Sequence, residues 1–416
     1  MLLRFTIQYP HFGIPLIIVG CFLLYKFHTA ESTLRIRRTI RRGRKIQEDD
    51  LRADALQCIS RQDPQFSQEL FLQRIKAGFL RIQQGWSDQD LRTCRAFISD
   101  GVFDRFDLYI RMQKKEHIRN RMKNVAVTNS EIVCVTSDAQ FDTIHVRITA
   151  SAISYNEDLT TGKRMDARSD VHPIAFTEIW SFSRRPGVPT HPSASVLEGR
   201  CPSCGGPVDI VDRASCSQCQ SVVNSGRYDW VLAEITQDEE WVVPPAEHRV
   251  AGWDEIAARD PGLNFQHVED RASVIFWRSL MAVYFEDPGY AIPVLHRSLP
   301  GVPKHWDHGQ GRFWKTPAVG VVEVTSSQPA ADDGQDRLTV LVRWSASPAE
   351  GDRRSPILTG HQRVYSHVLV LSRNSGVRSH SDQTFSSSHC QNCGAPVQTS
   401  QAAACVYCSM PLNDGS

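Results

Sequence analysis

Eight of the twelve cysteines fall into four C-x-x-C pairs, and these pairs are the residues whose type and spacing most clearly fit a chemical role. In each set of two pairs, eleven residues separate one pair from the next. Two cysteines three positions apart in a tight turn direct both sulfurs at one ion, and a second such turn completes a tetrahedron. The pattern therefore predicts two zinc ions. The expected ligands are Cys201, Cys204, Cys216 and Cys219 for the first and Cys390, Cys393, Cys405 and Cys408 for the second.

Redox chemistry and an iron–sulfur cluster are the alternatives for these cysteines. A redox C-x-x-C motif is usually single and stands at the start of a helix beside a strand, whereas two sites of identical spacing favour zinc. The segments Gly205-Gly206-Pro207 and Gly394-Ala395-Pro396 supply the sharp turn that must come after the second cysteine of each set. Four thiolates leave no open coordination position, so a structural role coupled to folding is expected.

Zinc ribbons often contact nucleic acid, but this requires basic and aromatic side chains nearby. Arg200, Arg213 and Arg227 flank the first ribbon and are offset by Asp209 and Asp212, while the second has no cation between its cysteines. The net charge of +1 gives no general attraction either. Nucleic acid is therefore not the expected partner.

The sequence contains no glycine-rich phosphate loop, nucleophile elbow or H-E-x-x-H motif. The stretch His305-Trp306-Asp307-His308 is a conceivable metal cluster, but its proline and glycine neighbours favour a solvated loop. Asp63 and Asp260 each precede proline and are expected to cap helices. No nucleophile–base pair is indicated, so we expect a protein without catalytic activity.

The amino-terminal 30 residues predict a transmembrane anchor. Residues 5–25 are mainly apolar, and 14–25 contain no charge, which is close to the length that a spanning helix needs. Eight cations then come between Lys26 and Lys45, against the single acid Glu31. By the positive-inside rule, the bulk of the chain lies in the cytoplasm.

Residues 31–54 are expected to form a basic juxtamembrane helix along anionic headgroups. A cleaved signal peptide, a mitochondrial presequence and a buried core helix are the alternatives for the amino-terminal region. The arginine block opposes export of the residues on its carboxyl-terminal side, and a presequence would be amphipathic from its start.

The sequence also indicates an internal duplication. Asp63-Pro64 and Asp260-Pro261 each open a segment with apolar residues at helical spacing, and the second lies 197 positions after the first. We align Val146-Arg147 with Val342-Arg343, 196 positions later, and find an offset of 189 at the first cysteine of each ribbon.

Strands are expected after each helical segment. In the first half they cover 126–134, 143–151 and 176–184, and in the second half 318–325, 338–347 and 364–373. Short helices are expected at 91–98 and 290–299. Each half therefore predicts an α+β domain of helices and an antiparallel sheet. The expected order is domain 1 (55–195), zinc ribbon 1 (196–228), domain 2 (229–385) and zinc ribbon 2 (386–416).

The first half resembles the bacterial Tim44-like domain family over about residues 55–187. The matching residues are Asp63-Pro64, Phe71-Leu72, Phe79, Ile82-Gln83, Trp86, Asp90-Leu91 and the strand from Phe176 to Phe182. The second half, about 250–376, matches more loosely, because Phe285 or Tyr284 replaces the tryptophan and proline follows Asp287. The resemblance implies an α+β cone similar to nuclear transport factor 2 (NTF2), with an apolar pocket.

The mitochondrial relative is a peripheral membrane scaffold that tethers the import Hsp70 to the inner-membrane translocase, although its Hsp70-recruiting region has no visible counterpart here. The resemblance thus implies membrane association and partner binding without catalysis. We expect a single-pass scaffold of the bacterial inner membrane that presents cytoplasmic domains to a protein or lipid partner, in protein translocation or membrane-complex assembly. The rival expectation is an enzyme or small-ligand-binding protein that uses the apolar pocket of an NTF2-like fold.

Overall fold

The computed structural model of the chain describes residues 53, 56–165, 172–193, 195–208, 215–245, 249–296, 311–331, 334–398, 400 and 402–415. The chain divides into two compact units, Met1–Ala53 and Asp54–Ser416, and nearly all described residues belong to the second. The predicted anchor, the predicted basic helix except for Ala53, and the His305–His308 stretch lie outside the described residues. Within the described part, no helix has both the length and the apolarity to cross a bilayer.

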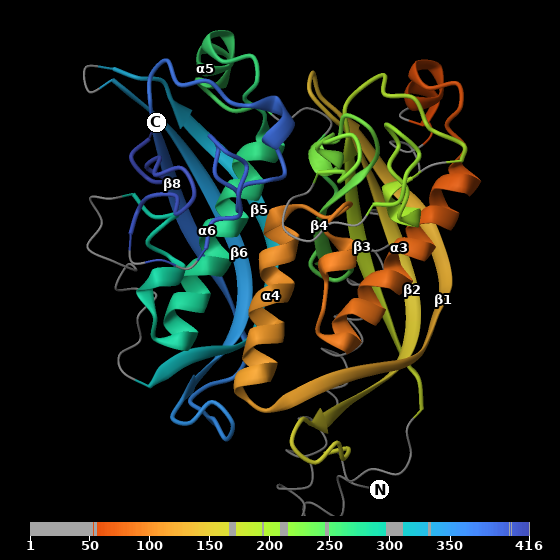
Figure 1. The fold of residues 1–416 in the computed structure, drawn as a ribbon, viewed down its shortest axis with the longest axis vertical. Helices are drawn as coiled ribbons and strands as arrows, with labels where there is room; N and C mark the ends of the chain where they lie inside the picture. The colour runs from red at the N-terminus through yellow and green to blue at the C-terminus, as the bar shows by residue number, and fades with distance from the viewer. Residues whose placement is uncertain are drawn as a thin grey trace, which may run out of the picture. The chain divides into compact units, whose positions relative to one another are not determined.

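The first half of the second unit packs two long helices near a four-stranded antiparallel sheet of order β1-β2-β3-β4 (Figure 1). Its elements are α3 (Gln68–Asp88), the 3₁₀ turn η1 (Arg92–Cys94), α4 (Asp100–Lys115), β1 (Ile118–Ser137), β2 (Asp142–Asp158), β3 (Ile174–Arg184) and β4 (Val231–Gln237). The 3₁₀ turns η2 (Val196–Glu198) and η3 (Val223–Ser225) flank the first ribbon.

The second half repeats this order of helix and antiparallel sheet. Its elements are α5 (Trp253–Arg259), α6 (Phe265–Phe285), η4 (Pro288–Tyr290), β5 (Arg312–Gln328), β6 (Gln335–Glu350), β7 (Ile357–Leu358), β8 (Arg363–Asn374) and η5 (Ser381–Gln383). β6 pairs with β5 on one side and with β8 and the short β7 on the other. The predicted α+β class with antiparallel sheets is confirmed.

The long helices α3 and α6 begin and end in the same way. The side chain of Ser67 accepts a hydrogen bond from the amide of Leu70, and that of Asn264 accepts one from His267. Both helices stop at a left-handed residue with φ of 55°, Gln89 and Glu286 respectively. Caps of this kind satisfy the free amides at a helix start, so serine and asparagine set the boundaries rather than the aspartates four positions earlier.

The expectation that Asp63 and Asp260 cap the starts of the long helices is wrong, because Ser67 and Asn264 cap α3 and α6. Asp63 is buried, and its Oδ2 lies 3.0 Å from the Arg184 guanidinium at the end of β3. It also accepts hydrogen bonds from the amide of Thr190 at 3.0 Å and from its hydroxyl at 2.5 Å. Asp63 therefore ties the segment before α3 to the end of β3, because a buried arginine needs an anionic partner.

Asp260 makes the same set of contacts in the second half. Its Oδ2 lies 2.6 Å from Arg373, 3.0 Å from the amide of Ser379 and 2.7 Å from the hydroxyl of that serine. Both the ion pair and the two hydrogen bonds therefore recur between the halves.

β1 and β5 share their irregularities. Each strand has three register shifts against its hairpin partner, and those of β5 come 192 positions after those of β1. Next to the first shift stands a residue with positive φ, Asn124 at 51° and Thr316 at 49°. The two sheets are therefore built on one plan.

The pairing corrects the sequence alignment of β2 with β6. Asp142 pairs with Arg184 in the first sheet, and Asp336 pairs with Arg373 in the second. These pairs make β6 follow β2 by 194 positions, so Val146 corresponds to Val340 and the aligned Val-Arg dipeptides are two residues out of step. A recurring dipeptide does not fix a register, whereas the ladder of backbone hydrogen bonds does.

α4 is an element that the sequence analysis missed. Ser99 caps it by accepting a hydrogen bond from Val102, and Leu108 and Met112 are buried against α6. α4 lies beside α6 (Figure 1), and a Cβ on Gly101 would come within 2.7 Å of Ser273, so glycine permits this close approach. The helix expected at 91–98 is only the single turn η1, and in the described part of 290–299, residues 290–296, only Tyr290 belongs to a helical turn, η4.

β4 joins the two halves. It lies in the segment assigned by sequence to domain 2, yet it pairs with β3 and completes the first sheet. The hydroxyl of Thr236 on β4 is 3.4 Å from the carbonyl oxygen of Gly320 on β5, so the first sheet also contacts the second half. Residues 54–416 form one compact unit as a result.

Candidate metal centres

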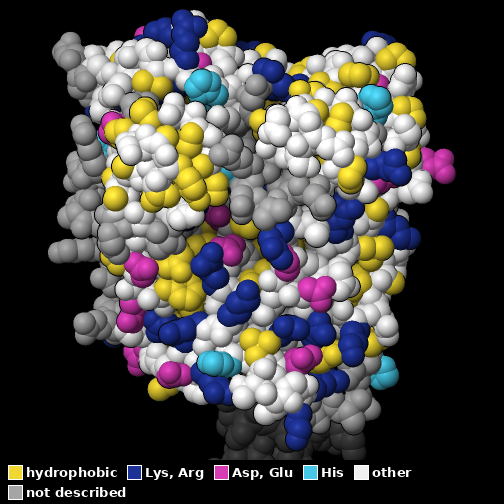
Figure 2. Space-filling model, in the orientation of Figure 1, with side chains coloured by type: hydrophobic (Ala, Val, Ile, Leu, Met, Phe, Trp, Pro, Cys, Tyr) yellow, Lys and Arg dark blue, Asp and Glu magenta, His cyan; other side chains and the backbone are white. Residues whose placement is uncertain are grey.

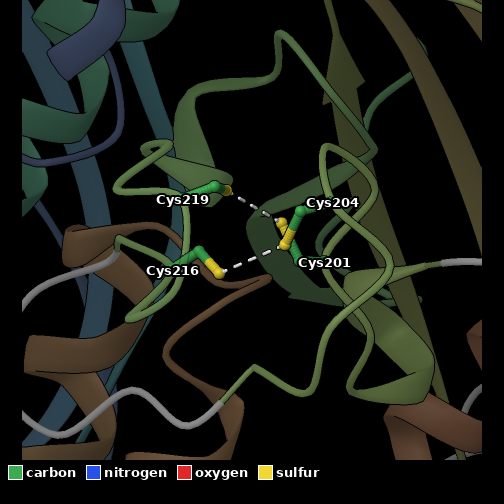
Figure 3. Close-up of side chains that lie close together, drawn as sticks. All are labelled: Cys201, Cys204, Cys216 and Cys219. Atoms are coloured by element: carbon green, nitrogen blue, oxygen red, sulfur yellow. Dashed lines mark hydrogen bonds between the residues drawn. The ribbon is translucent and has the colours of Figure 1, made fainter.

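The first ribbon brings its four predicted cysteines together (Figure 3). The Sγ atoms of Cys201 and Cys219 are 3.7 Å apart, those of Cys204 and Cys216 are 3.8 Å apart, and all four lie within 4.8 Å of one another. A tetrahedral ion with metal–sulfur bonds of about 2.3 Å requires sulfurs about 3.8 Å apart. A disulfide requires about 2.05 Å. The sulfurs are therefore spaced as metal ligands.

The second ribbon has the same geometry. The Sγ atoms of Cys390 and Cys408 are 3.7 Å apart, those of Cys393 and Cys405 are also 3.7 Å apart, and the four again lie within 4.8 Å. The structure thus unites each predicted set of four cysteines and mixes none between the ribbons.

Each ribbon consists of two tight turns. The amide of Cys201 donates to the carbonyl of Gly206 at 2.8 Å, and that of Cys390 donates to Ala395 at the same distance. Gly205 and Gly394 have φ of 76° and 66°, a conformation that glycine adopts without strain. The glycines noted in the sequence therefore close the first turn of each ribbon.

The surroundings of the sulfurs differ in a regular way. Burial raises the pKa of the Cys201 and Cys390 thiols to about 12. A hydrogen bond with the Ser221 hydroxyl lowers the pKa of Cys219 to about 6, and one with the Asn392 side chain lowers the pKa of Cys408 to about 6. Each cluster thus combines a buried sulfur that needs a cation to ionise with a more accessible sulfur that ionises readily; Cys219 is exposed and Cys408 is half-buried. This donor set fits a divalent soft cation.

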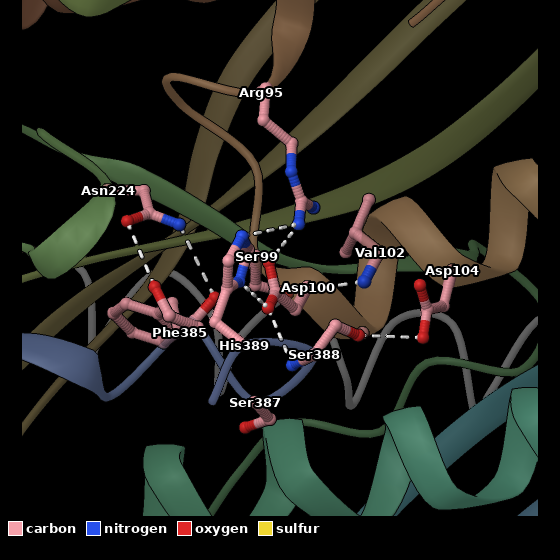
Figure 4. A network of polar contacts seen from close by, with 12 residues as sticks. Arg95, Ser99, Asp100, Val102, Asp104, Asn224, Phe385, Ser387, Ser388 and His389 are labelled. Atoms are coloured by element: carbon pink, nitrogen blue, oxygen red, sulfur yellow. Dashed lines mark hydrogen bonds and ion pairs between the residues drawn. The ribbon is translucent and has the colours of Figure 1, made fainter. Parts of the chain in front are cut away.

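A buried polar network joins the second ribbon to the first half of the unit (Figure 4). Asp100, at the start of α4, is fully buried. Its carboxylate lies 2.8 Å from Arg95 Nη2, 2.7 Å from His389 Nδ1 and 2.6 Å from the amide of Ser388. His389 directly precedes the predicted ligand Cys390, so the first turn of this ribbon is fixed to α4.

Two further carboxylates extend the network to α6. Asp104 lies 3.1 Å from Arg278 and 2.8 Å from the Ser388 hydroxyl. Asp270 on α6 accepts a hydrogen bond from the amide of Gly101 at 2.8 Å. Burial, together with the negative charge of Asp100, raises the pKa of Asp270 to about 7. α4, α6 and the second ribbon therefore meet in one network.

Sequence reasoning missed this network. Asp100 and His389 are 289 positions apart, and neither belongs to a recognised motif. The one local signal was Ser99-Asp100, which resembles a helix start and marks the missed helix α4.

A cavity of about 270 Å³ opens beside this network, between α4, α6 and the second ribbon. Three arginines line it, and each is paired with an aspartate. The pairs are Arg95–Asp100, Arg111–Asp107 and Arg278–Asp104. The charges of the wall are therefore balanced within the protein.

The space between α3 and the first sheet is filled by aromatic side chains. The ring of Phe79 on α3 lies 5.1 Å from that of Trp180 on β3, and Phe71 lies 6.0 Å from Phe182. All four side chains are buried in one continuous apolar cluster. The apolar interior expected of this domain is thus packed.

Comparisons with known proteins support part of the family resemblance. Residues 52–193 match the family model described as the Tim44-like domain. A search of curated proteins finds no match. A solved structure described as "Ntf2 like protein involved in plasmid conjugation" aligns with 64% of this chain and 90% of its own, at 7% identity and a TM-score of 0.14, which is too low to support an argument.

Proposed function

We propose that this chain, which carries a Tim44-like domain at residues 52–193, is a non-catalytic binding protein anchored in the bacterial cytoplasmic membrane. In this proposal the cytoplasmic domains are presented to a protein or lipid partner. The process served is protein translocation or the assembly of a membrane complex.

The packed interior of the Tim44-like domain is the main support for a non-catalytic role. An enzyme of this architecture would work in the hollow between helix and sheet, and that hollow is occupied here by Phe71, Phe79, Trp180 and Phe182. Rings 5–6 Å apart fill such a space at the density of a protein core. The outer surface is then left for binding.

We also propose that each four-cysteine cluster binds one structural zinc ion. The spacing of the sulfurs fits zinc, and four thiolates complete its coordination. Such ions would stabilise the turns of the ribbons and supply no site for a substrate.

The charges on the face shown in Figure 2 support a protein or lipid partner rather than nucleic acid. Figure 2 shows basic and acidic side chains interspersed over the lower part of the visible face, and hydrophobic side chains gathered at its upper left. A nucleic-acid site would show a continuous basic stripe.

Membrane attachment is tested by fractionation of cells that express the full chain. We expect the chain in the membrane pellet after a high-pH carbonate wash, and we expect deletion of residues 1–30 to release it. A matched control replaces only the cations between Arg35 and Lys45, which should leave the span in the membrane. Recovery of the full chain with soluble proteins would contradict the anchor.

Partner binding is tested by crosslinking in those membranes and identifying the proteins and lipids that co-purify. Partners recovered with the full chain and lost when the Tim44-like domain is deleted would support the scaffold. If no protein or lipid is enriched over the control, the scaffold proposal fails. If instead a small molecule co-purifies and occupies the cavity beside Arg278, the rival ligand-binding function is favoured.

A further inference from the structure

The outer edge of β8 corresponds to the edge of β3 that pairs with an additional strand, β4, in the first half. β3 pairs with β2 on one edge and with β4 on the other, with Ile179 opposite Thr236. β8 takes the place of β3 in the second half and pairs with β6. In the described part of the chain, no strand lies on its other edge.

Corresponding side chains differ sharply in exposure. Ile179 and Ser181 on β3 are 0% and 4% exposed, whereas Val368 and Val370, which correspond to them 189 positions later, are each 61% exposed. In the first half, β4 and the segment after it cover this region, with Trp241 packed 5.6 Å from His145. The second half thus exposes an apolar surface that its own repeat keeps covered.

The composition of β8 does not oppose pairing. Residues 364–371 read VYSHVLVL and contain no charged side chain. Pairing with β6 has no register shift. Edge strands usually carry a lysine, a proline or a bulge that blocks association. β8 has none of these along its central residues, so its free edge can accept a further strand.

We propose that β8 is an interface at which a second copy of this chain adds its own β8 in antiparallel orientation. The two sheets then continue into one another across a twofold axis, the commonest symmetry of protein dimers. This inference does not rest on the proposed scaffold function.

Self-complementarity is what identifies a second copy as the occupant. A twofold axis at Val368 places Ser366 opposite Val370 of the second copy and Val364 opposite Ser372. No like charges meet over residues 364–372. At the ends of the strand Arg363 faces Arg373, whose charge is already balanced by Asp260 and Asp336. Val368 meets Val368 of the second copy on the axis, and the other valines of both strands lie on the same face opposite serines, so one apolar cross-strand pair stabilises the centre of the interface.

The test is analytical ultracentrifugation of the full chain in density-matched detergent. Wild-type protein should form a concentration-dependent dimer. Val368→Arg appears twice in the interface and sets like charges opposite each other, so it should raise the dimer Kd at least about tenfold. The matched control is Val242→Arg, because Val242 is 63% exposed and lies outside β8. It should leave the Kd unchanged.

Hydrogen exchange gives a second measurement that needs no variant. Amides on the free edge of β8 should become protected as the wild-type concentration rises, while those of exposed loops should not. A wild-type chain that stays monomeric at every accessible concentration overturns the proposal. So does a dimer that Val368→Arg leaves intact, or one that is broken only by Val406→Arg on the second ribbon.

Discussion

At the scale of single residues, the repeat retains its buried charges as well as its apolar core. Arg184 lies at the end of β3 and Arg373 near the end of β8, and each meets an aspartate that precedes a long helix. The side chain of Arg184 is 2% exposed, and that of Arg373 is 19% exposed. Removing an acid from a buried pair leaves an uncompensated charge, and the cost grows as water is excluded.

We therefore expect Asp63→Ala to lower the free energy of unfolding by about 3–5 kcal/mol. Asp260→Ala should cost less, because water can reach Arg373 and because Asp336, 3.9 Å away, still offers it a negative charge. Urea denaturation of the two variants compares them directly. Equal losses would show that burial of the arginine does not set the cost.

Asp270 predicts a pH dependence. Its pKa is about 7 in the folded protein against an ordinary value of 3.8, so the folded state holds a proton that the unfolded state has lost. This group's contribution to stability therefore falls as pH rises from about 4 to about 7 and is constant above that window. Asp270→Asn keeps an acceptor for the Gly101 amide but cannot ionise.

The Asp270→Asn variant should therefore gain at least about 1 kcal/mol relative to wild type between pH 5 and pH 8. Unfolding free energies at both pH values measure this gain. Asp254→Asn on α5, where the side chain is exposed, serves as the control. If the free energy of unfolding changes between the two pH values by the same amount in the variant and in wild type, ionisation of Asp270 does not destabilise the folded state.

At the scale of elements, the sequence predicts most of the strands but not the helix α4 or the strand β4. Alternating residues predicted the central parts of β1, β2, β3, β5, β6 and β8, because a strand with one buried face carries a local signal. α4 was missed because Leu108 and Met112 pack on residues such as Phe276 and Leu280, about 170 positions away. β4 was missed because the first ribbon separates it in sequence from β3, the strand with which it pairs.

β1 and β5 share a register shift beside Asn124 and Thr316, and exchanging these two residue types gives a prediction. Asn124 tolerates a positive φ, whereas the branched side chain of Thr316 is strained in the same conformation. Both residues are exposed, so packing should change little. We expect Thr316→Asn to stabilise the protein by about 1 kcal/mol and Asn124→Thr to destabilise it by a similar amount. Thermal unfolding of both variants tests this, and shifts of the same sign would contradict it.

At the scale of the whole unit, the second ribbon is part of the junction between the halves. His389 and Ser388 bond to Asp100, and Arg278 on α6 donates to the carbonyl of Val397 within the ribbon at 2.9 Å. The sequence predicted both ribbons from spacing alone, because C-x-x-C turns are local. Where the second ribbon docks depends on contacts almost 300 residues apart, which no local pattern records.

Metal content tests the central claim most directly. Mass-spectrometric elemental analysis of the full chain, purified under reducing conditions without added metal, should find two zinc ions per chain. Cys204→Ser and Cys393→Ser should each reduce this to one, since each removes a ligand from a different cluster. A wild-type chain without stoichiometric metal, or variants that keep both ions, would contradict two closed four-thiolate sites.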